Sequence, residues 1–527
     1  MKNIYILKLE QKLSQYNGQY YHFNGANGKV RWPMEDGAFL GETGAWNFFW
    51  RLGFQPQLIA MKDLVNISAE DIIVVCATNL FNPEIVTFLK SCLSRGALLI
   101  ASGNPQAWEP FLGSVQSCRY DHPYAALAYL VNEKVWLMAP PAWTYMQQES
   151  GNEGFEAVGQ LAAIHGERQT PERALVTPLP DAPAILKKGN FVYLNANPFA
   201  AFQAWLQGQE DLQPWMLWRH RMFWLDEWVA DLNKILSLVG IDLTNLTRTG
   251  IDGLGETTIV LRHDLDSSRD TSYLEEENKR GFPAVYAILN DKNTGFWVNQ
   301  LAKYPQHEKA YHYNTLASSI LKTLYFRLTK TTSGAYRPGF KDIVGKNLQR
   351  QARWAIKNGV AAETLHRHGS FMIYPEWIDA MDEVLNEYPH ITGSSSLFRG
   401  HLLRWGVDRV DTLRGHISEF PDVHFPLWYP FRIAHAGYAG KMLKGWECTT
   451  VMEIEPQFFK QLISYKMPEL PQRIVTLNFH PAHACTGTFT SSGSLRWFKD
   501  ILDIIGERDI RVETLGCIYK KASECIA

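Results

Sequence analysis

Short apolar runs, separated by helical patterns, characterise the first half of the chain and predict an α/β fold. Residues 71–77 and 96–103 are two such runs, and a helical pattern over residues 83–93 lies between them. A strand, a helix and a strand at this spacing form a βαβ unit, which implies a parallel sheet. Residues 189–195 supply a further strand. We therefore expect an α/β domain with a parallel sheet over residues 1–245.

A tryptophan-rich segment closes this first domain. Over residues 215–238, apolar side chains recur at helical spacing and predict a helix. The four tryptophans of the segment are Trp215, Trp218, Trp224 and Trp228. We interpret this aromatic stripe as core or as an interface that seals two domains, and we place a second domain over residues 246–527.

The most informative strand of the second half ends in two carboxylates. Residues 259–266 form an apolar run that closes with Asp264 and Asp266. Side chains at positions i and i+2 share one face of a strand, and the C-terminal ends of parallel strands are where α/β proteins place their chemistry. The acidic pair therefore predicts a metal ligand beside a general base. The alternative interpretation is a solvated strand end or a helix cap.

Two histidines also lie at the ends of predicted strands. His312 is close to the end of an extended run over residues 307–314, and His480 is the last residue of the run 473–480. The remaining predicted elements of this half are a strand over 281–289, a helix over 494–505 and a strand over 510–515. Polar strand ends that recur within one half of a chain favour a barrel with a shared mouth.

Composition excludes several classes of partner. The 527 residues carry 52 basic and 54 acidic side chains, so no global charge favours nucleic acid or an anionic membrane. Seven scattered cysteines without a C-x-x-C pair argue against a disulfide scaffold and a zinc knuckle. The N-terminal apolar run is too short for a signal peptide, and no uncharged run approaches the ~18 residues that span a bilayer. We expect a cytoplasmic protein of undefined oligomeric state.

Residues 255–527 resemble the polysaccharide deacetylase superfamily, the NodB-homology domain, because four features follow one another in the family's order. These are Asp264-Leu-Asp266, the strand Gly281-Phe-Pro-Ala-Val-Tyr286, His307-Glu followed by His312 with Gln306 in place of a leading glycine, and His480 before a helix and a last strand. The resemblance implies a distorted (β/α) barrel, a carbohydrate substrate and hydrolysis of an N-acetyl group on a sugar.

The resemblance also implies a role for each of these side chains. A divalent metal, usually zinc, would be held by one carboxylate and two imidazoles, while a second carboxylate and a further histidine move protons. By motif position, Asp264 would be the general base and His480 the general acid. Asp266 and His312 would be metal ligands.

The third metal ligand departs from the family pattern. Four residues after His312 the chain has Leu316, which cannot ligate a metal. His366 and His368 are the substitutes, and His368 is slightly favoured because it adjoins Gly369. Such departures also occur in inactive members of the superfamily. The alternative to a deacetylase is therefore an inactive protein of the same fold that binds a glycan or a protein partner. Glycosidase-like cleavage ranks last. It needs two acids about 5 to 10 Å apart on opposite sides of a cleft, whereas Asp264 and Asp266 are neighbours on one strand.

Three further residues are candidates for substrate binding. Arg337, in Tyr336-Arg-Pro-Gly-Phe340, resembles the family's arginine-proline motif, which orients the catalytic base; an ordinary loop turn is the alternative. Trp428 and Arg432 belong to an aromatic, proline-rich stretch that could wall a sugar cleft. Packing in a core or a loop is the alternative for both.

The strand order of the N-terminal domain resembles the flavodoxin-like domains of the glutamine-amidotransferase superfamily. Catalytic members carry a cysteine on a sharp elbow between a strand and a helix, flanked by glycines. Here Cys76 lies inside a strand, between Val75 and Ala77. We therefore predict a non-hydrolytic domain of this type.

Overall fold

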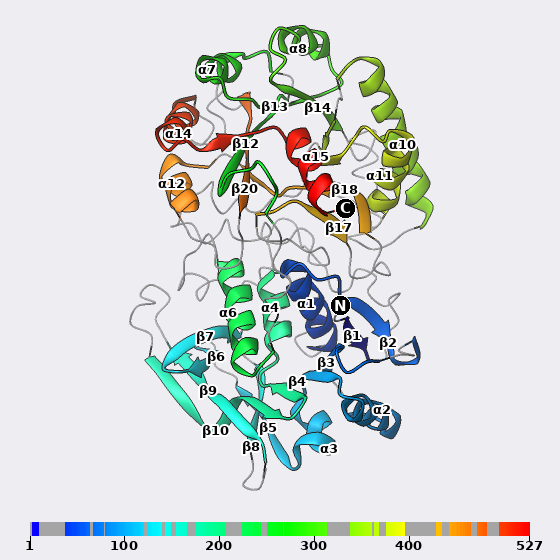
Figure 1. The fold of residues 1–527 in the computed structure, drawn as a ribbon, viewed down its shortest axis with the longest axis vertical. Helices are drawn as coiled ribbons and strands as arrows, with labels where there is room; N and C mark the ends of the chain where they lie inside the picture. The colour runs from blue at the N-terminus through cyan, green and yellow to red at the C-terminus, as the bar shows by residue number, and fades with distance from the viewer. Residues whose placement is uncertain are drawn as a thin grey trace. The chain divides into compact units, whose positions relative to one another are not determined.

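The computed structural model describes the two halves of the chain as two compact units (Figure 1). The first comprises the described residues up to 243, and the second comprises those from 250 onward. The described residues are 3–9, 37–63, 67–77, 80–120, 125–139, 143–148, 154–165, 175–206, 224–241, 243, 250–266, 268–313, 338–360, 363–367, 376–395, 428–434, 442–452, 454–464, 472–481 and 495–526.

Five parallel strands form one half of the sheet in the first unit. They are β1 (Ile4–Lys8), β2 (Gln57–Ala60), β3 (Ile72–Ala77), β4 (Leu98–Gly103) and β11 (Phe191–Leu194). Their order across the sheet is β2-β1-β3-β4-β11, and each neighbouring pair is parallel. Counted along the chain this order is 2-1-3-4-5, which is the order of flavodoxin-type sheets. The strands predicted at residues 71–77, 96–103 and 189–195 are confirmed.

Helices cover both faces of this parallel half. On one face, α2 (Pro83–Ser94) packs Ile85 and Leu89 into a cluster with Ile73 and Val75 of β3. On the other face, α1 (Gly37–Arg51) packs against α4 (Pro198–Leu206), with the rings of Phe48 and Phe199 5.8 Å apart. α6 (Trp224–Leu238) stacks Trp228 on Phe202 of α4 at 4.8 Å, so this tryptophan is part of the core.

The other half of the same sheet is antiparallel, which corrects the prediction of a parallel sheet. β10 (Leu175–Lys188), β9 (Glu156–His165), β6 (Ala125–Val131) and β7 (Lys134–Ala139) follow β11 in that order. A separate antiparallel pair is formed by β5 (Val115–Tyr120) and β8 (Trp143–Gln148). Prolines conceal β10 in the sequence, because proline is disfavoured within a sheet. The structure accommodates them with a register shift between Pro178 and Pro183.

Cys76 is a structural residue of the first unit. Its side chain is fully buried, and burial raises the pKa of the thiol to about 12. It contacts the Ser102 hydroxyl at 3.2 Å, and a Cβ at Gly41 of α1 would lie 2.6 Å from its own Cβ. A thiol that is neutral and enclosed in this way is not a nucleophile.

Parallel strands form the core of the second unit. They are β12 (Thr257–Asp264), β13 (Val285–Ile288), β14 (Glu308–Tyr313), β15 (Leu365–Arg367), β19 (Thr450–Met452) and β20 (Arg473–Phe479). Their order is β15-β14-β13-β12-β20-β19. β21 (Arg511–Val512) also pairs with β12. The strands predicted near residues 259–266, 281–289, 307–314 and 473–480 are thereby confirmed, whereas the strand predicted over 510–515 is reduced to two residues, because Leu515 already begins the helix α15 (Leu515–Ile526).

The remaining pairings carry the sheet round to its starting point. A parallel bridge joins Thr364 to Gly393, the first residue of β16 (Gly393–Ser394), and β16 pairs in parallel with β18 (Met442–Glu447). Two residues separate the end of β18 from the start of β19, and β19 pairs with β20. β18 and β19 are thus two parts of one segment, and the strands form a barrel-like ring. An antiparallel strand, β17 (Phe431–Ala434), adds to β18 outside the ring.

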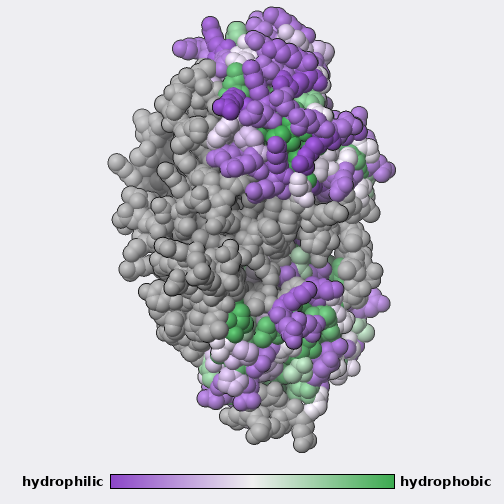
Figure 2. Space-filling model, turned by 90° about the vertical axis from the view of Figure 1, so that its left-hand side faces the viewer, coloured by the Kyte–Doolittle hydropathy of each residue, from purple (hydrophilic) through white to green (hydrophobic). Residues whose placement is uncertain are grey.

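Helices surround this barrel-like sheet (Figure 1). They are α7 (Ser272–Arg280), α8 (Thr294–Leu301), α10 (Pro338–Lys357), α11 (Glu376–Glu387), α12 (Pro456–Ser464) and α14 (Leu495–Glu507). On the face seen in Figure 2, the described surface of the second unit is mostly hydrophilic, as expected of helices that bury their apolar sides. Within the described part of the chain, no helix has the length and apolar character to cross a bilayer.

The interior of the barrel has an apolar layer and a polar layer. Val260 of β12 lies in a cluster with Val285, Ala310 and residues of α15 (Leu515–Ile526), including Tyr519. Arg262 and Asp264, on the same face of β12 as Val260, form part of the polar layer nearer the C-terminal ends of the strands. α15 therefore closes the N-terminal end of the barrel and leaves the polar end for chemistry.

A buried carboxyl links the polar layer to α15. Glu308 Oε2 accepts a hydrogen bond from the Gly516 N–H at 2.9 Å, and its other oxygen accepts from the Thr364 hydroxyl. Burial raises the pKa of Glu308 from 4.5 to about 7, although these hydrogen bonds oppose the shift.

This pKa predicts that Glu308 destabilises the second unit as pH rises. Between about pH 4.5 and 7 the folded state keeps the Glu308 proton that the unfolded state has lost, so stability falls across this window by on the order of 3 kcal/mol. Thermal unfolding from pH 4 to 8 should show a smaller decline in Glu308→Gln than in the unsubstituted protein. A constant difference in Tm at every pH would contradict the prediction.

Candidate active site

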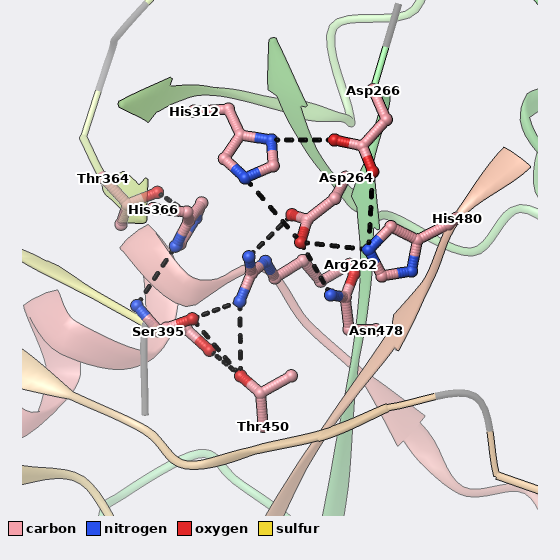
Figure 3. A network of polar contacts seen from close by, with 10 residues as sticks. All are labelled: Arg262, Asp264, Asp266, His312, Thr364, His366, Ser395, Thr450, Asn478 and His480. Carbon is pink, nitrogen blue, oxygen red and sulfur yellow. Dashed lines mark hydrogen bonds and ion pairs between the residues drawn. The ribbon is translucent and has the colours of Figure 1, made fainter. Parts of the chain in front are cut away.

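The C-terminal end of β12 places Asp264 inside the mouth of the barrel, where both of its oxygens accept hydrogen bonds (Figure 3). Arg262 Nη2 donates to Oδ1 at 2.6 Å, and Asn478 Nδ2 donates to Oδ2 at 2.8 Å. His263 points to the opposite face of the strand, where its Nε2 lies 2.6 Å from Glu277 of α7. This alternation, inward at 262 and 264 and outward at 263, follows from the pleat of the strand.

Two imidazoles from distant strands converge on the acidic pair, as the sequence predicted. His480 Nε2, just after β20, lies 3.6 Å from Asp264 Oδ2 and 3.7 Å from Asp266 Oδ2. His312 of β14 presents Nε2 to Asp264 Oδ2 at 3.9 Å and Nδ1 to Asp266 Oδ1 at 3.8 Å. Figure 3 shows the four side chains facing one another. We refer to Asp264, Asp266, His312 and His480 as the acid–histidine cluster.

The two carboxylates of the cluster differ in their surroundings. Asp264 is buried, and although burial alone favours its neutral form, the charge of Arg262 and the two nearby imidazoles hold its pKa well below the usual range. Asp264 is therefore an anion throughout the physiological range. The side chain of Asp266 is 24 % exposed and follows the strand in a left-handed conformation, with φ of 38°. Asp266 is thus the carboxylate closer to solvent.

His366 lies near the cluster, but both of its ring nitrogens are occupied. Its Nδ1 accepts a hydrogen bond from the Ser395 N–H at 3.1 Å, so in the neutral ring the proton is on Nε2. Nε2 lies 3.1 Å from the Thr364 hydroxyl, which donates its own proton to Glu308. Burial, followed by the charge of Arg262, lowers the pKa of His366 well below its usual value. This arrangement does not support the expected role of His366 as a metal ligand.

Two of the predicted substrate-binding residues, Trp428 and Arg432, are not brought to the cluster. Trp428 is buried, and its carbonyl accepts from the Ile474 N–H at 2.8 Å, near the start of β20 and away from His480. The Arg432 guanidinium lies over the ring of Trp446, 5.0 Å from its centroid, and Trp446 belongs to the apolar cluster around α15. Neither placement supports a role in a sugar cleft. His368 and Arg337 lie outside the described residues.

The acid–histidine cluster suits a divalent metal in its chemistry and nearly in its spacing. Carboxylate oxygens and imidazole nitrogens are common zinc ligands, and at tetrahedral geometry such atoms are about 3.3 Å apart. The nitrogen–oxygen separations of 3.6 to 3.9 Å are too long for hydrogen bonds and slightly longer than this spacing. Among the described residues, no group of three or more His, Cys, Asp or Glu is already arranged to hold a metal ion.

Several residues of the site were not predicted from the sequence, although some left a recognisable pattern. A basic residue within the apolar run Ile259-Val-Leu-Arg-His-Asp264, two positions before the acid, is consistent with a same-face ion pair. Asn478 stands in the same relation to His480. Ser395 and Thr450 have no such pattern, since their contacts with Arg262 depend on the closure of the barrel.

The sequence matches no family model and no curated protein. Among solved structures it is similar to a candidate polysaccharide deacetylase of O-antigen biosynthesis from Bordetella bronchiseptica, with 13% identity and a TM-score of 0.27, over 48% of this chain and 90% of that one. A mutant CE4-family pseudoenzyme with restored activity is 12% identical, with a TM-score of 0.27 over 51% and 69% of the two chains. A peptidoglycan N-acetylglucosamine deacetylase is 11% identical, with a TM-score of 0.24 over 51% and 89%. At these TM-scores the similarity assigns neither a fold nor a function.

Proposed function

We propose that the second unit is a metal-dependent hydrolase of the polysaccharide deacetylase type, which removes an acetyl or other acyl group from an amino sugar or glycan. The observation that supports the proposal is the convergence of two carboxylates and two imidazoles at the C-terminal mouth of a parallel barrel. In α/β barrels this end of the strands carries the catalytic groups.

In this proposal the residues of the cluster divide into ligands and proton-transfer groups. Asp266 and His312, with His368 as a third candidate, would hold a divalent metal, for which zinc suits carboxylate and imidazole ligands. Asp264 would accept a proton from water, and His480 would protonate the leaving nitrogen. Since a carboxylate with a lowered pKa is a weak base, the water must itself be acidified, and this is what a bound metal supplies. His480 Nε2, close to both carboxylates, is placed to carry a proton across the site.

A catalytically inactive binding protein of the same fold is the second candidate. The observation that favours it is the engagement of both His366 nitrogens. Of the two histidines expected to replace the ligand missing at Leu316, this leaves only His368, which lies outside the described residues. In that case the barrel mouth would bind a glycan or a protein partner without turnover.

Metal analysis of the purified protein separates the two candidates. We expect a near-stoichiometric divalent metal that is lost in Asp266→Asn and in His312→Gln, because each removes a ligand. His366→Gln is the matched control and should retain the metal, because His366 is expected to act outside the ligand set. Release of acetate from acetylated chitooligosaccharides should accompany metal binding. Absence of metal from the unsubstituted protein after zinc loading would contradict the hydrolase and favour the binding protein.

We propose further that residues 1–245 form a flavodoxin-type domain without hydrolytic activity, distinct from the catalytic domain at 246–527. The strand order 2-1-3-4-5 of its parallel half and the enclosed thiol of Cys76 support this proposal. Its role would be to position the substrate or a partner. The described cysteines are unpaired with one another, which is consistent with the cytoplasmic location we propose.

A further inference from the structure

Arg262 is a fully buried arginine inside the barrel, and it reaches the site from the same strand as Asp264. It is 0% exposed, and its position two residues before Asp264 places both side chains on the inner face of β12. Its Nη2 donates to Asp264 Oδ1 at 2.6 Å. Burial of a guanidinium is costly unless the group is paired. The ion pair with Asp264 therefore offsets the cost of the buried charge of Arg262.

The guanidinium is held on its other side by β19 and by the residue after β16, neither of which pairs with β12. Its Nη1 donates to the Ser395 carbonyl, which follows β16, and lies 3.4 Å from Thr450 Oγ1 of β19. The hydroxyls of Ser395 and Thr450 are themselves hydrogen-bonded to each other. The Ser395 N–H also binds His366, so β15 contributes to the same support (Figure 3). Both terminal nitrogens of Arg262, Nη1 and Nη2, are therefore held by hydrogen bonds.

This arrangement determines which way the carboxylate of Asp264 faces. With Oδ1 held by Arg262, Oδ2 is directed toward Asn478, His312 and His480. We infer that Arg262, supported by Ser395 and Thr450, is the residue that positions Asp264 for proton transfer, the role that the sequence resemblance gave to Arg337. This inference rests on the proposed function for its catalytic meaning, but the pairing itself can be tested without activity.

The first test is a double-variant comparison of stability, which needs no substrate. Asp264→Asn should lower Tm by roughly 5 °C or more, because it leaves a buried guanidinium without its anion. If the main partner of Arg262 is Asp264, Arg262→Met should lower Tm in the unsubstituted protein. In the Asp264→Asn background the same substitution should instead recover much of the loss in Tm. Equal losses from Arg262→Met in both backgrounds would overturn the inference. The result tests the pairing of Arg262 with Asp264 even if the protein proves not to be a hydrolase.

The second test separates positioning from structural support in the active protein. Arg262→Lys should lower kcat by about 10²-fold with little change in KM, since an ammonium cannot reproduce the fork that joins Asp264 to Ser395. In Arg262→Ala, added guanidinium ion should restore part of kcat, whereas added ammonium should not. Arg280→Met is the matched control, because Arg280 pairs with Glu276 and Asp503 outside the barrel and should leave kcat unchanged. An Arg262→Lys variant that keeps full kcat would overturn the positioning role.

Discussion

Asp264→Asn is expected to lower the rate of acyl hydrolysis by about 10³-fold or more while leaving the metal bound. The substitution preserves the shape of the side chain but removes the anion that would accept the proton of water, and loss of a general base costs about 10² to 10⁴-fold. It should also destabilise the second unit by about 3 to 5 kcal/mol, because it breaks a buried ion pair and leaves Arg262 unpaired.

The rate is measured as acetate release and the stability by thermal unfolding, with Asp252→Asn as the control. Asp252 is an exposed aspartate of the same unit, and its substitution should change neither quantity. The pKa of Asp264 is lowered in the folded state, so its ionisation stabilises the fold above the unfolded pKa of about 4 and loses this effect as pH falls further. The difference in Tm between Asp264→Asn and the unsubstituted protein should therefore shrink below about pH 4. Full activity in Asp264→Asn would remove this residue from the mechanism.

Gly393→Ala is expected to open the barrel between β16 and β18. Gly393 pairs with Trp446 in the short parallel contact that closes the ring. A Cβ at this position would overlap the Trp446 carbonyl oxygen and lie 2.8 Å from Tyr519 Cε2 of α15. Because the oxygen belongs to the backbone of the partner strand, relief requires the strands to separate. We expect destabilisation of at least about 2 kcal/mol, together with displacement of the neighbouring Ser395.

Thermal unfolding and hydrogen exchange of the Trp446 amide would measure this effect. Trp446 N–H donates to the Thr392 carbonyl at 2.9 Å, so separation of the strands should accelerate its exchange. The control is Gly295→Ala, at a position in α8 where an added Cβ meets nothing within 4 Å. This control should be neutral or stabilising by about 0.5 to 1 kcal/mol, since alanine favours a helix. Equal Tm values for the two variants would show that closure at Gly393 contributes little.

The acid–histidine cluster was predictable because its members share a simple local property. Asp264, His312 and His480 each stand at or near the C-terminal end of a predicted strand, and parallel strands bring such positions to one rim. His366 was expected as a ligand for another reason, because it could substitute for the ligand missing at Leu316. What separates it from the others is a pair of contacts with Ser395 and Thr364, which sequence spacing cannot reveal.

The fold was predictable where the chain follows ordinary strand chemistry and not where it departs from it. The strands β3, β4 and β20, which contain no proline, were located within a few residues. β10 was missed because its prolines are typical of loops, and the antiparallel half of the first sheet was missed with it. β16 has two residues, so it has no sequence pattern of its own, although it completes the ring.

The pairing of β12 with β20 has a consequence for how the second unit is made. Thr257 is the partner of Arg473, so the strand that carries Asp264 meets the strand before His480 only after more than two hundred intervening residues have left the ribosome. Until then one side of β12 is an unpaired edge, which can pair with other chains. Contacts this distant in sequence also form slowly. Nascent chains of this protein should therefore depend on chaperones that shield open strands during synthesis.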